Sequence, residues 1–374
     1  MTGFPDSGVM NDALWRDVFT DADTFVGAED TIHAQLYHRL LLHGYSSKDV
    51  AREWRSDGHP YDVAVFAGGD GQFKTTSATP SAVFEVKGGA YNTRNALHDR
   101  ITYDGYCDDH AYLAALPADI GERWFVCVDM RELGRAVRAS GQRGSRCIAD
   151  IAQQSSDLGI STAYFCQGEN RFYVARPGQS LREIPLHATS MDGSESGLFD
   201  VLTDPKVLQC LETATTSITG HESNYTAYLY HLLRTRDFSP RQLSLETYFK
   251  FAPRQQRPDL TVYGPDYDGK FNLYPGGDNS RNNDLHKCQH LRGCIEVKAK
   301  QATKHYISDI EKLAQWRDVI TNYYSRREPE MIFIAFDTRS RPMPEAELQD
   351  LVGTARANAV RLIYLNKFTS EVLV

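Results

Sequence analysis

The spacing of apolar and polar positions predicts alternating helices and strands along most of the chain. Ile32, Leu36, Leu40 and Leu41 recur at helical spacing, while several short β-branched and apolar runs are typical of buried strands. In the first half the predicted elements are helix 29–43, strands 61–67 and 81–86, helix 92–114, strand 124–128, helix 147–157 and strand 161–166.

The second half repeats this order of predicted elements. They are helix 222–234, strands 259–263 and 292–298, helix 304–323, strand 331–336, helix 344–356 and strand 360–365. Between the halves the chain is rich in Ser, Thr, Gly and Pro and has no sustained period, which indicates a connector. The pattern therefore predicts two α/β domains, at 1–180 and 216–374, joined by a connector at 181–215.

Individual residues also repeat between the halves. Leu-Tyr-His at 36–38 recurs at 229–231, an offset of 193, and Tyr164 recurs as Tyr364, an offset of 200. A further pair is Asp129 with Asp337, at an offset of 208. Matched residues in an unchanged order, with drift only in loops, indicate a duplicated domain.

Composition agrees with a folded protein of two domains. The chain has 374 residues, 41% of them hydrophobic and 11% aromatic, enough for two cores of about 150 residues each. No apolar run approaches the roughly 20 residues that span a bilayer, and no signal peptide is evident. Seven cysteines at irregular spacings argue against a disulfide framework, so we expect a cytoplasmic protein with no membrane partner.

Each half carries an aspartate ahead of a Glu-x-Lys motif. In the first half a predicted helix begins with Glu29, a strand carries Asp62, and the next strand carries Glu85 and Lys87. The second half repeats the pattern with Glu222, Asp259, Glu296 and Lys298. Strand alternation puts the glutamate and the lysine of each motif on one face of a sheet. One Glu-x-Lys motif has little meaning, but two complete sets indicate a repeated metal-dependent site.

These motifs and their order resemble the PD-(D/E)xK nuclease superfamily. Pro258-Asp259 followed by Glu296-x-Lys298 matches the full signature, while Tyr61 replaces the proline in the first half. The resemblance implies two tandem restriction-endonuclease-like domains, each a mixed central sheet flanked by helices. It also implies a phosphodiesterase that depends on Mg²⁺, with Mn²⁺ as a substitute.

The resemblance gives each residue of the motif a role. Asp62, Glu85, Asp259 and Glu296 would be metal ligands, and the carbonyls of Val86 and Val297 would be third ligands. Lys87 and Lys298 would orient the attacking water or stabilise charge on the phosphate. Glu29 and Glu222 would help to hold a second ion or a water.

Charge and loop length favour the second half as the part that contacts nucleic acid. The net charge is −8, and residues 1–200 carry 18 basic against 28 acidic side chains, so the excess of acid lies in the first half. The second half has a longer, Asn-rich segment before its Glu-x-Lys motif. The expected contacts with phosphates or bases are Arg281, Lys287, Arg292, Lys300 and Lys304. His286, Cys288, His290 and Cys294 do not have the spacing of a standard zinc finger.

We therefore expect an endonuclease of double-stranded DNA with one active site per domain, in restriction or antiviral defence. An oligomer or a partner protein of a defence system is compatible with this function. Two alternatives remain open. In the first, only the second domain is catalytic and the first is regulatory. In the second, the chain is a non-catalytic module that binds nucleic acid or protein.

Overall fold

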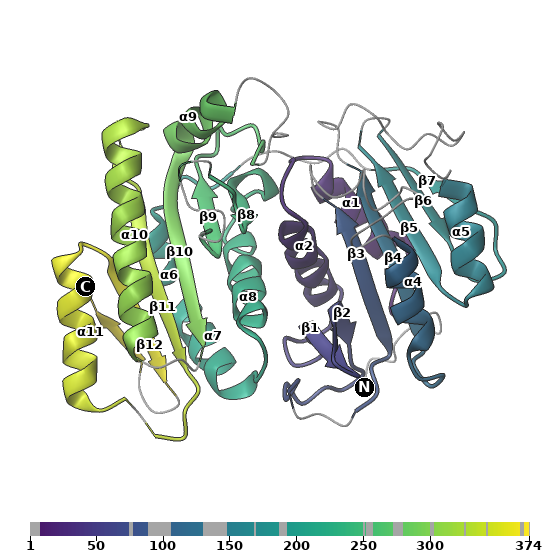
Figure 1. Ribbon diagram of the computed structural model, residues 1–374, viewed down its shortest axis with the longest axis horizontal. Coiled ribbons are helices and arrows are strands. Elements are labelled where there is room, and N and C mark those ends of the chain that lie inside the picture. The colour runs from purple at the N-terminus through teal and green to yellow at the C-terminus, as the bar shows by residue number, and fades with distance from the viewer. Residues whose placement is uncertain are drawn as a thin grey trace. The chain divides into compact units, whose positions relative to one another are not determined.

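The computed structural model describes residues 8–74, 78–88, 106–129, 148–167, 170–186, 193–249, 251, 257–271, 280–299, 303–324, 327–341, 343–366 and 370–373. These residues divide into two compact units, unit 1 at 8–186 and unit 2 at 193–373 (Figure 1). Each unit is a mixed β-sheet with helices packed on it, which confirms the predicted α/β class. In the described ranges, none of the helices combines the length and the apolar character that crossing a membrane requires.

Unit 1 contains a seven-stranded sheet in the order β1-β2-β3-β4-β5-β6-β7. The strands β3, β4 and β5 are parallel to one another, and all the other pairings are antiparallel. Its elements are α1 (Asp12–Ala22), α2 (Glu29–Leu42), β1 (Val50–Ser56), β2 (His59–Val65), β3 (Ala82–Gly88), α4 (Tyr106–Ala115), β4 (Glu122–Asp129), α5 (Ile148–Asp157), β5 (Ser161–Cys166), β6 (Arg171–Ala175) and β7 (Arg182–Ile184).

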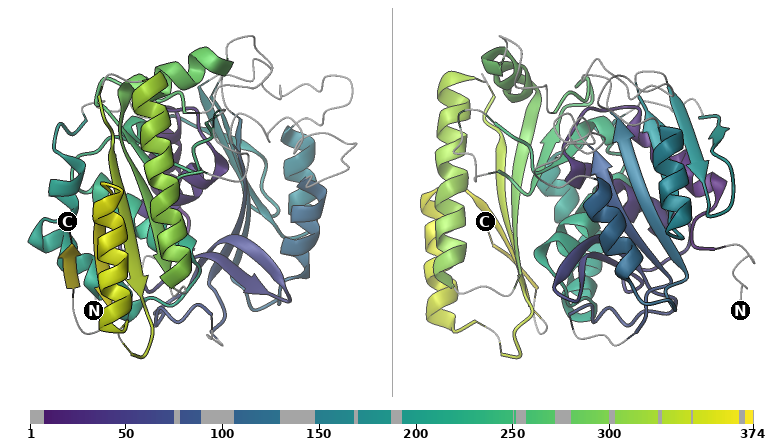
Figure 2. Two further views of the ribbon diagram at one scale, coloured as in Figure 1. Left: turned by 60° about the vertical axis from the view of Figure 1, so that its left-hand side comes forward. Right: turned by 45° about the vertical axis from the view of Figure 1, so that its right-hand side comes forward.

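Aromatic side chains hold helices on both faces of the unit 1 sheet. Trp124 of β4 packs against Trp15 of α1, and the next residue, Phe125, packs edge-on against His110 of α4. Successive strand residues point to opposite faces, so α1 and α4 cover opposite faces of the sheet. The helices α4 and α5 lie side by side, joined by a 3.0 Å hydrogen bond between Ser155 and His110 (Figure 2).

Unit 2 contains a six-stranded sheet in the order β13-β12-β11-β10-β9-β8. Again three consecutive strands, here β10, β11 and β12, are parallel to one another. Its elements are α6 (Leu198–Leu202), α7 (Pro205–Ser217), α8 (Glu222–Arg234), η2 (Pro240–Gln242), β8 (Leu243–Leu245), β9 (Leu260–Tyr263), α9 (Ser280–His290), β10 (Leu291–Ala299), α10 (Thr303–Tyr323), β11 (Glu330–Asp337), α11 (Glu345–Ala357), β12 (Arg361–Asn366) and β13 (Ser370–Leu373).

The strand registers of the two sheets agree position by position. In unit 1 the residue before the motif glutamate, Phe84, pairs with the residue after the aspartate, Val63. In unit 2 the corresponding residues, Ile295 and Leu260, pair in the same way. The agreement extends to the parallel strands, where Glu85 pairs with Phe125 and Glu296 pairs with Phe333. The signature residues therefore occupy equivalent places in two sheets of the same pairing order.

The predicted elements are found with small shifts at their ends, and several others were not predicted. Elements missing from the prediction are α1, β1, β6, β7, α6, α7, η2, β8, α9 and β13. The expected connector at 181–215 is wrong in its described part, because it contains β7, α6 and α7. The strand β7 pairs with β6 in unit 1, while α6 and α7 pack on β11 and β12 in unit 2. The predicted helix 92–114 is described only from residue 106 onward.

Candidate functional site

The signature aspartates lie where two antiparallel strands part. In unit 1 the pairing of β2 with β3 ends at Val63 and Phe84, and beyond this point the carboxylate of Asp62 accepts a 2.7 Å hydrogen bond from the backbone N–H of Val86. In unit 2 Asp259 accepts a 2.6 Å bond from the N–H of Val297. Each side chain thus satisfies a backbone donor at the point where the ladder of hydrogen bonds ends.

This hydrogen bond also shows which edge of the strand faces the aspartate. In a strand the N–H and the C=O of one residue point to the same edge, as in the pairs that exchange both bonds. The carbonyls of Val86 and Val297 are therefore directed to the edge on which Asp62 and Asp259 lie. That is the arrangement expected of a third oxygen ligand.

The signature glutamates are almost completely buried on the face of the sheet that carries the lysines. Glu85 and Glu296 have relative exposures of 3% and 2%. Lys87 Nζ lies 3.3 Å from Asp109 of α4, and Lys298 Nζ lies 3.8 Å from Asp309 of α10. The helix that follows each Glu-x-Lys strand therefore adds a fourth carboxyl group to the set.

The helix glutamates anchor the end of the Glu-x-Lys strand. Glu29 Oε2 accepts a 2.9 Å hydrogen bond from the N–H of Gly88, and Glu222 Oε2 accepts a 3.3 Å bond from the N–H of Ala299. In unit 2 the other oxygen, Glu222 Oε1, also accepts a 2.7 Å bond from Lys298 Nζ. Both oxygens of Glu222 therefore contact the end of the Glu-x-Lys strand or its lysine, and its expected role at a second ion or a water stays a prediction.

Burial and neighbouring carboxyl groups raise the pKa of two glutamates at the unit 1 site, Glu85 and Glu29. Burial, reinforced by the neighbouring charges of Asp62 and Asp109, raises the pKa of Glu85 to about 11. Burial and Asp62 together raise the pKa of Glu29 to about 8. Burial alone would lower the pKa of Lys87, but Asp109, Glu29 and Asp62 raise it, so the ammonium stays charged.

The carboxyl groups of unit 2 have a second ammonium beside them. Burial and the charge of Glu296 raise the pKa of Asp259 well above its ordinary value. Burial also raises the pKa of Glu296, but Lys312 and Lys298 oppose that change. Lys312 Nζ lies 2.5 Å from Glu296 Oε1 and 3.4 Å from Asp309, on the same helix, α10.

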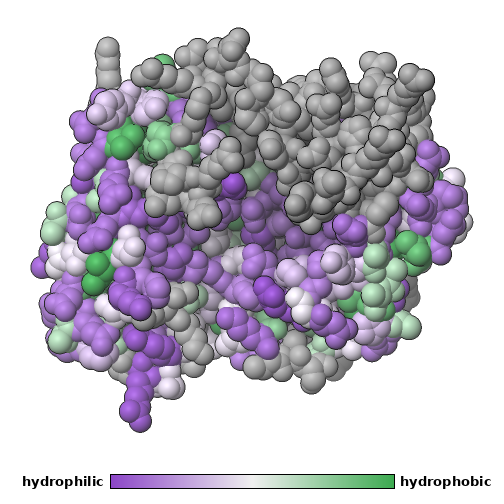
Figure 3. Space-filling model, in the orientation of Figure 1, coloured by the Kyte–Doolittle hydropathy of each residue, from purple (hydrophilic) through white to green (hydrophobic). Residues whose placement is uncertain are grey.

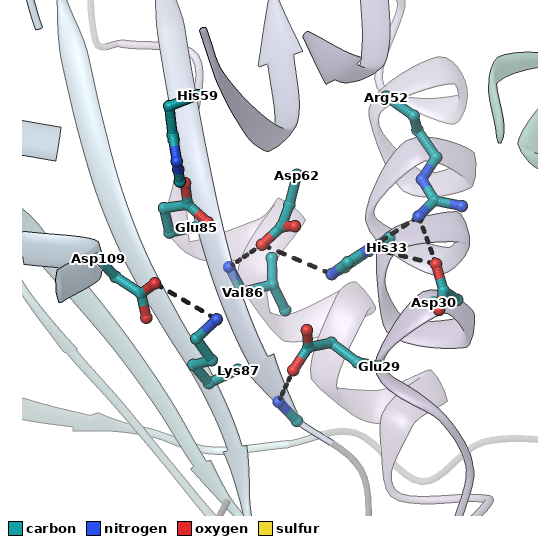
Figure 4. Close-up of polar contacts among 11 residues, drawn as sticks. Glu29, Asp30, His33, Arg52, His59, Asp62, Glu85, Val86, Lys87 and Asp109 are labelled. Carbon is teal, nitrogen blue, oxygen red and sulfur yellow. Dashed lines mark hydrogen bonds and ion pairs between the residues drawn. The ribbon is translucent and has the colours of Figure 1, made fainter. Parts of the chain in front are cut away.

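Unit 1 has histidines at its site that the sequence did not single out (Figure 4). His33 of α2 places Nε2 3.7 Å from Asp62, while its Nδ1 lies 2.7 Å from Arg52, which also bonds Asp30 at 2.9 Å. Because the guanidinium of Arg52 can only donate, Nδ1 accepts and the proton of a neutral ring is on Nε2, facing the carboxylate. Burial lowers the pKa of His33, which favours this neutral form.

A second histidine contacts the buried glutamate of unit 1 directly. His59 Nε2 lies 2.8 Å from Glu85 Oε1, and the imidazole stacks on Tyr112 of α4 with ring centroids 3.7 Å apart. In the sequence, only the spacing of these two histidines could have indicated them. His33 is four residues after Glu29 on one helix, and His59 is three residues before Asp62.

The expected contacts with nucleic acid differ in their surroundings. Lys304 is exposed in the first turn of α10, and Figure 3 shows mostly hydrophilic residues on the described surface over α10 and α11. Arg292 has a side chain only 14% exposed and contacts Glu195 and the carbonyl of Ser194. The backbone of Arg281 lies in α9, its side chain is not described, and Lys300 is outside the described residues.

Lys287 requires a correction. Its side chain is 1% exposed, and its ammonium bonds the carbonyl of Tyr248, lies 3.2 Å from Asp284 and sits over the ring of Phe249. Burial lowers its pKa while Asp284 opposes that change. Lys287 holds α9 in place in this structure and does not present a charge to a phosphate.

The carboxylate and carbonyl oxygens at each site are suitable ligands for a hard divalent cation. Mg²⁺ keeps several of its waters and needs only one or two carboxylates, which Asp259 and Glu296 supply beside the carbonyl of Val297. Glu296 Oε2 is buried without a hydrogen-bond partner among the described residues. A buried acceptor normally has a partner, so this oxygen is available to a cation. In the described ranges no three His, Cys, Asp or Glu side chains are arranged so that they could together hold a metal ion, so carbonyl and water oxygens would complete any shell.

Comparisons of this chain with protein-family models, with curated proteins and with solved structures found no match.

Proposed function

We propose that this protein is a Mg²⁺-dependent endonuclease with two tandem PD-(D/E)xK-like domains and one site in each. The observation that carries the proposal is the repeated set of contacts in units 1 and 2. In each unit an aspartate bonds the amide after a buried glutamate, and a helix glutamate bonds the amide after the lysine. A chance Glu-x-Lys on a strand has no reason to reproduce these contacts.

A tandem duplication is supported by contacts among residues outside the Glu-x-Lys motifs. Tyr164 donates its hydroxyl to Asp129 at 2.9 Å, and Tyr364 donates to Asp337 at 2.5 Å. These are the residues that repeat at offsets of 200 and 208 in the sequence. Two sheets with the same registers and the same buried Tyr–Asp pair are what two copies of one domain would give.

The chain's own groups would divide the work of phosphodiester hydrolysis. A bound Mg²⁺ would polarise the phosphate and lower the pKa of a water in its shell. The aspartate, the glutamate and the valine carbonyl of each motif would hold that ion. Lys87 and Lys298 are positioned beside the carboxylates as fixed positive charges, so each can orient the attacking water or stabilise the charge that grows on the phosphate.

Double-stranded DNA is the substrate that two linked sites suit best, because each site would cut one strand. Restriction of foreign DNA or antiviral defence is the biological setting we propose. The structure also favours one alternative arrangement, in which the sites are unequal, because Lys312 contacts the glutamate of unit 2 only.

A cleavage assay with paired variants tests the proposal. Purified full-length protein is incubated with supercoiled plasmid in Mg²⁺ or in Ca²⁺, beside the double variant Asp62→Ala/Asp259→Ala. We expect cleavage in Mg²⁺ alone and a loss on the order of 100-fold or more in the double variant. Full activity in the double variant would contradict both metal sites, and binding without cleavage in every metal would favour a non-catalytic module. Linear duplex, single-stranded DNA and RNA in the same assay identify the substrate.

A further inference from the structure

The two sites differ in the group that contacts the buried glutamate. In unit 1 Glu85 Oε1 lies 2.8 Å from the imidazole of His59, which begins β2. In unit 2 Glu296 Oε1 lies 2.5 Å from the ammonium of Lys312, which belongs to α10. The same oxygen therefore has an imidazole beside it in one unit and a permanent positive charge in the other.

Corresponding residues of the following helix show where this difference arises. Asp109 of α4 and Asp309 of α10 both contact the signature lysine of their unit. Three residues later on each helix, one turn along the same face, stand Tyr112 and Lys312. Tyr112 stacks on His59 instead of reaching Glu85, so the described part of unit 1 has an aromatic ring where unit 2 has an ammonium.

The ammonium of Lys312 is fixed in the site by several contacts. Besides Glu296 it lies 3.4 Å from Asp309 and 5.4 Å from the centre of the Trp316 ring, and its side chain is only 16% exposed. An ammonium is the ordinary form of a lysine side chain at neutral pH, and two carboxyl groups, those of Glu296 and Asp309, lie within 4 Å of this one. The four carboxyl groups at the unit 2 site therefore have two ammonium groups beside them, those of Lys298 and Lys312. The four carboxyl groups described at the unit 1 site have the ammonium of Lys87.

We propose that Lys312 acts as a built-in counter-ion of the unit 2 site, so that unit 1 binds a divalent cation more tightly and unit 2 binds one only when Lys312 leaves Glu296. The proposal rests on the metal-dependent function proposed above and adds an order of loading to it. A cation that approaches Glu296 meets the repulsion of an ammonium a few ångströms away. In unit 1 the helix position that corresponds to Lys312 holds Tyr112, whose ring stacks on His59 and brings no ammonium to Glu85.

Mn²⁺ binding to the full-length chain tests this inference without any measurement of activity. The double variant Asp259→Asn/Glu296→Gln leaves only the site of unit 1, and Asp62→Asn/Glu85→Gln leaves only the site of unit 2. Free Mn²⁺ is counted by electron paramagnetic resonance during a titration. We expect the unit 1 site to bind Mn²⁺ about tenfold or more tightly than the unit 2 site, as expected from one additional charge nearby.

Substitutions at the two helix positions make the test reciprocal. Lys312→Met in the chain that keeps only the unit 2 site should tighten Mn²⁺ binding about tenfold, and Tyr112→Lys in the chain that keeps only unit 1 should weaken it by a similar factor. Lys206→Met is the matched control, since it removes an exposed lysine of unit 2 on α7 and should change the affinity less than about twofold.

The outcomes separate this inference from the proposed function. Equal affinities at the two sites, or an unchanged affinity in both Lys312→Met and Tyr112→Lys, overturn the inference and leave the nuclease proposal standing. Unequal affinities that respond to both substitutions, in a protein that cleaves no nucleic acid, support the inference and overturn the nuclease proposal. An absence of Mn²⁺ binding at both sites overturns the inference together with the metal assignment.

Discussion

Tyr364 donates its hydroxyl to Asp337 at 2.5 Å, at the ends of two parallel strands of unit 2. Asp337 is 1% exposed, and Arg339 also binds it through both of its oxygens. In unit 1 Tyr164 makes the same contact with Asp129, which is 3% exposed. A buried carboxylate is expensive to leave without donors, so this pair fixes the relative position of the two strands next to the site.

The first prediction concerns this pair. Tyr164→Phe removes one donor from a buried carboxylate and should lower the free energy of unfolding of unit 1 by about 1.5–3 kcal/mol. Chemical denaturation followed by circular dichroism measures the change. Tyr173→Phe on β6 is the control, because Tyr173 is only half-buried, and it should cost less than about 0.5 kcal/mol. Equal effects of the two substitutions would show that the hydroxyl–carboxylate contact adds no stability.

The second prediction concerns pH. The pKa of Glu29 is raised in the folded chain from 4.5 to about 8, so the folded state binds the proton more tightly than the unfolded state. Its contribution to stability is fully present below pH 4.5 and is lost as the pH rises through about 8. Without divalent cations, the Tm should therefore fall across this range, and Glu29→Gln should make the decline shallower. A Glu29→Gln variant with the same pH dependence as the parent would show that Glu29 is not the titrating group.

The third prediction concerns the division of work between the lysines. Lys87 and Lys298 each contact carboxyl groups of one unit only, so Lys87→Ala should stop cutting by unit 1 and leave unit 2 intact. If each site cuts one strand, either single variant should convert plasmid linearisation into nicking, with a loss on the order of 100-fold in the second cut. Gel analysis of nicked and linear plasmid over time measures this. Unchanged linearisation by Lys87→Ala would leave unit 2 as the only catalytic unit.

The fourth prediction contrasts two lysines of unit 2. Lys304 is exposed, and Lys304→Ala should weaken DNA binding and reduce the salt slope by about 0.9 if it contacts one phosphate of B-form DNA. Lys287 is buried against Asp284, so Lys287→Ala should leave the salt slope unchanged and lower stability by about 3–5 kcal/mol. Fluorescence anisotropy at several salt concentrations and thermal denaturation give the two readings. A change of salt slope in Lys287→Ala would restore this residue as a phosphate contact.

The sequence predicted the parts of the site that lie on strands. Asp62 and Glu85 are brought together by one sheet register, and that register recurs in the second half although the loop there is longer, so the repeated motif was enough to find them. Lys312 and His59 could not be found in this way, because they reach the glutamate from different elements. The contact of Lys312 depends on how α10 is rotated on the sheet, and the contact of His59 depends on where β2 begins. Neither feature produces a periodic pattern in the sequence.

Two further elements, β1 and α9, were not predicted because their sequences are polar. The sequence of strand β1 is polar because it contains Arg52, Glu53 and Arg55. A positive φ of 51° at Glu53 also breaks the alternation of its side chains between the two faces of the sheet. The helix α9 has a strongly polar composition in place of an amphipathic one, and the buried ammonium of Lys287 is part of what ties it to the fold. Tertiary contacts decided the structure of both segments, and local propensity did not predict them.

The strand carrying the glutamate keeps its register while the group beside its carboxylate differs between the units. In unit 2 the charge beside Glu296 comes from Lys312 of α10 and not from the sheet, so exchanging Lys312 would leave the strand pairings untouched. Under the proposed metal-dependent function, one substitution at this helix position would change the affinity of one unit for a cation and leave the other unit as it is. The strand register is thus the feature that the two units share, and the helix position three residues after Asp109 or Asp309 is one at which they differ.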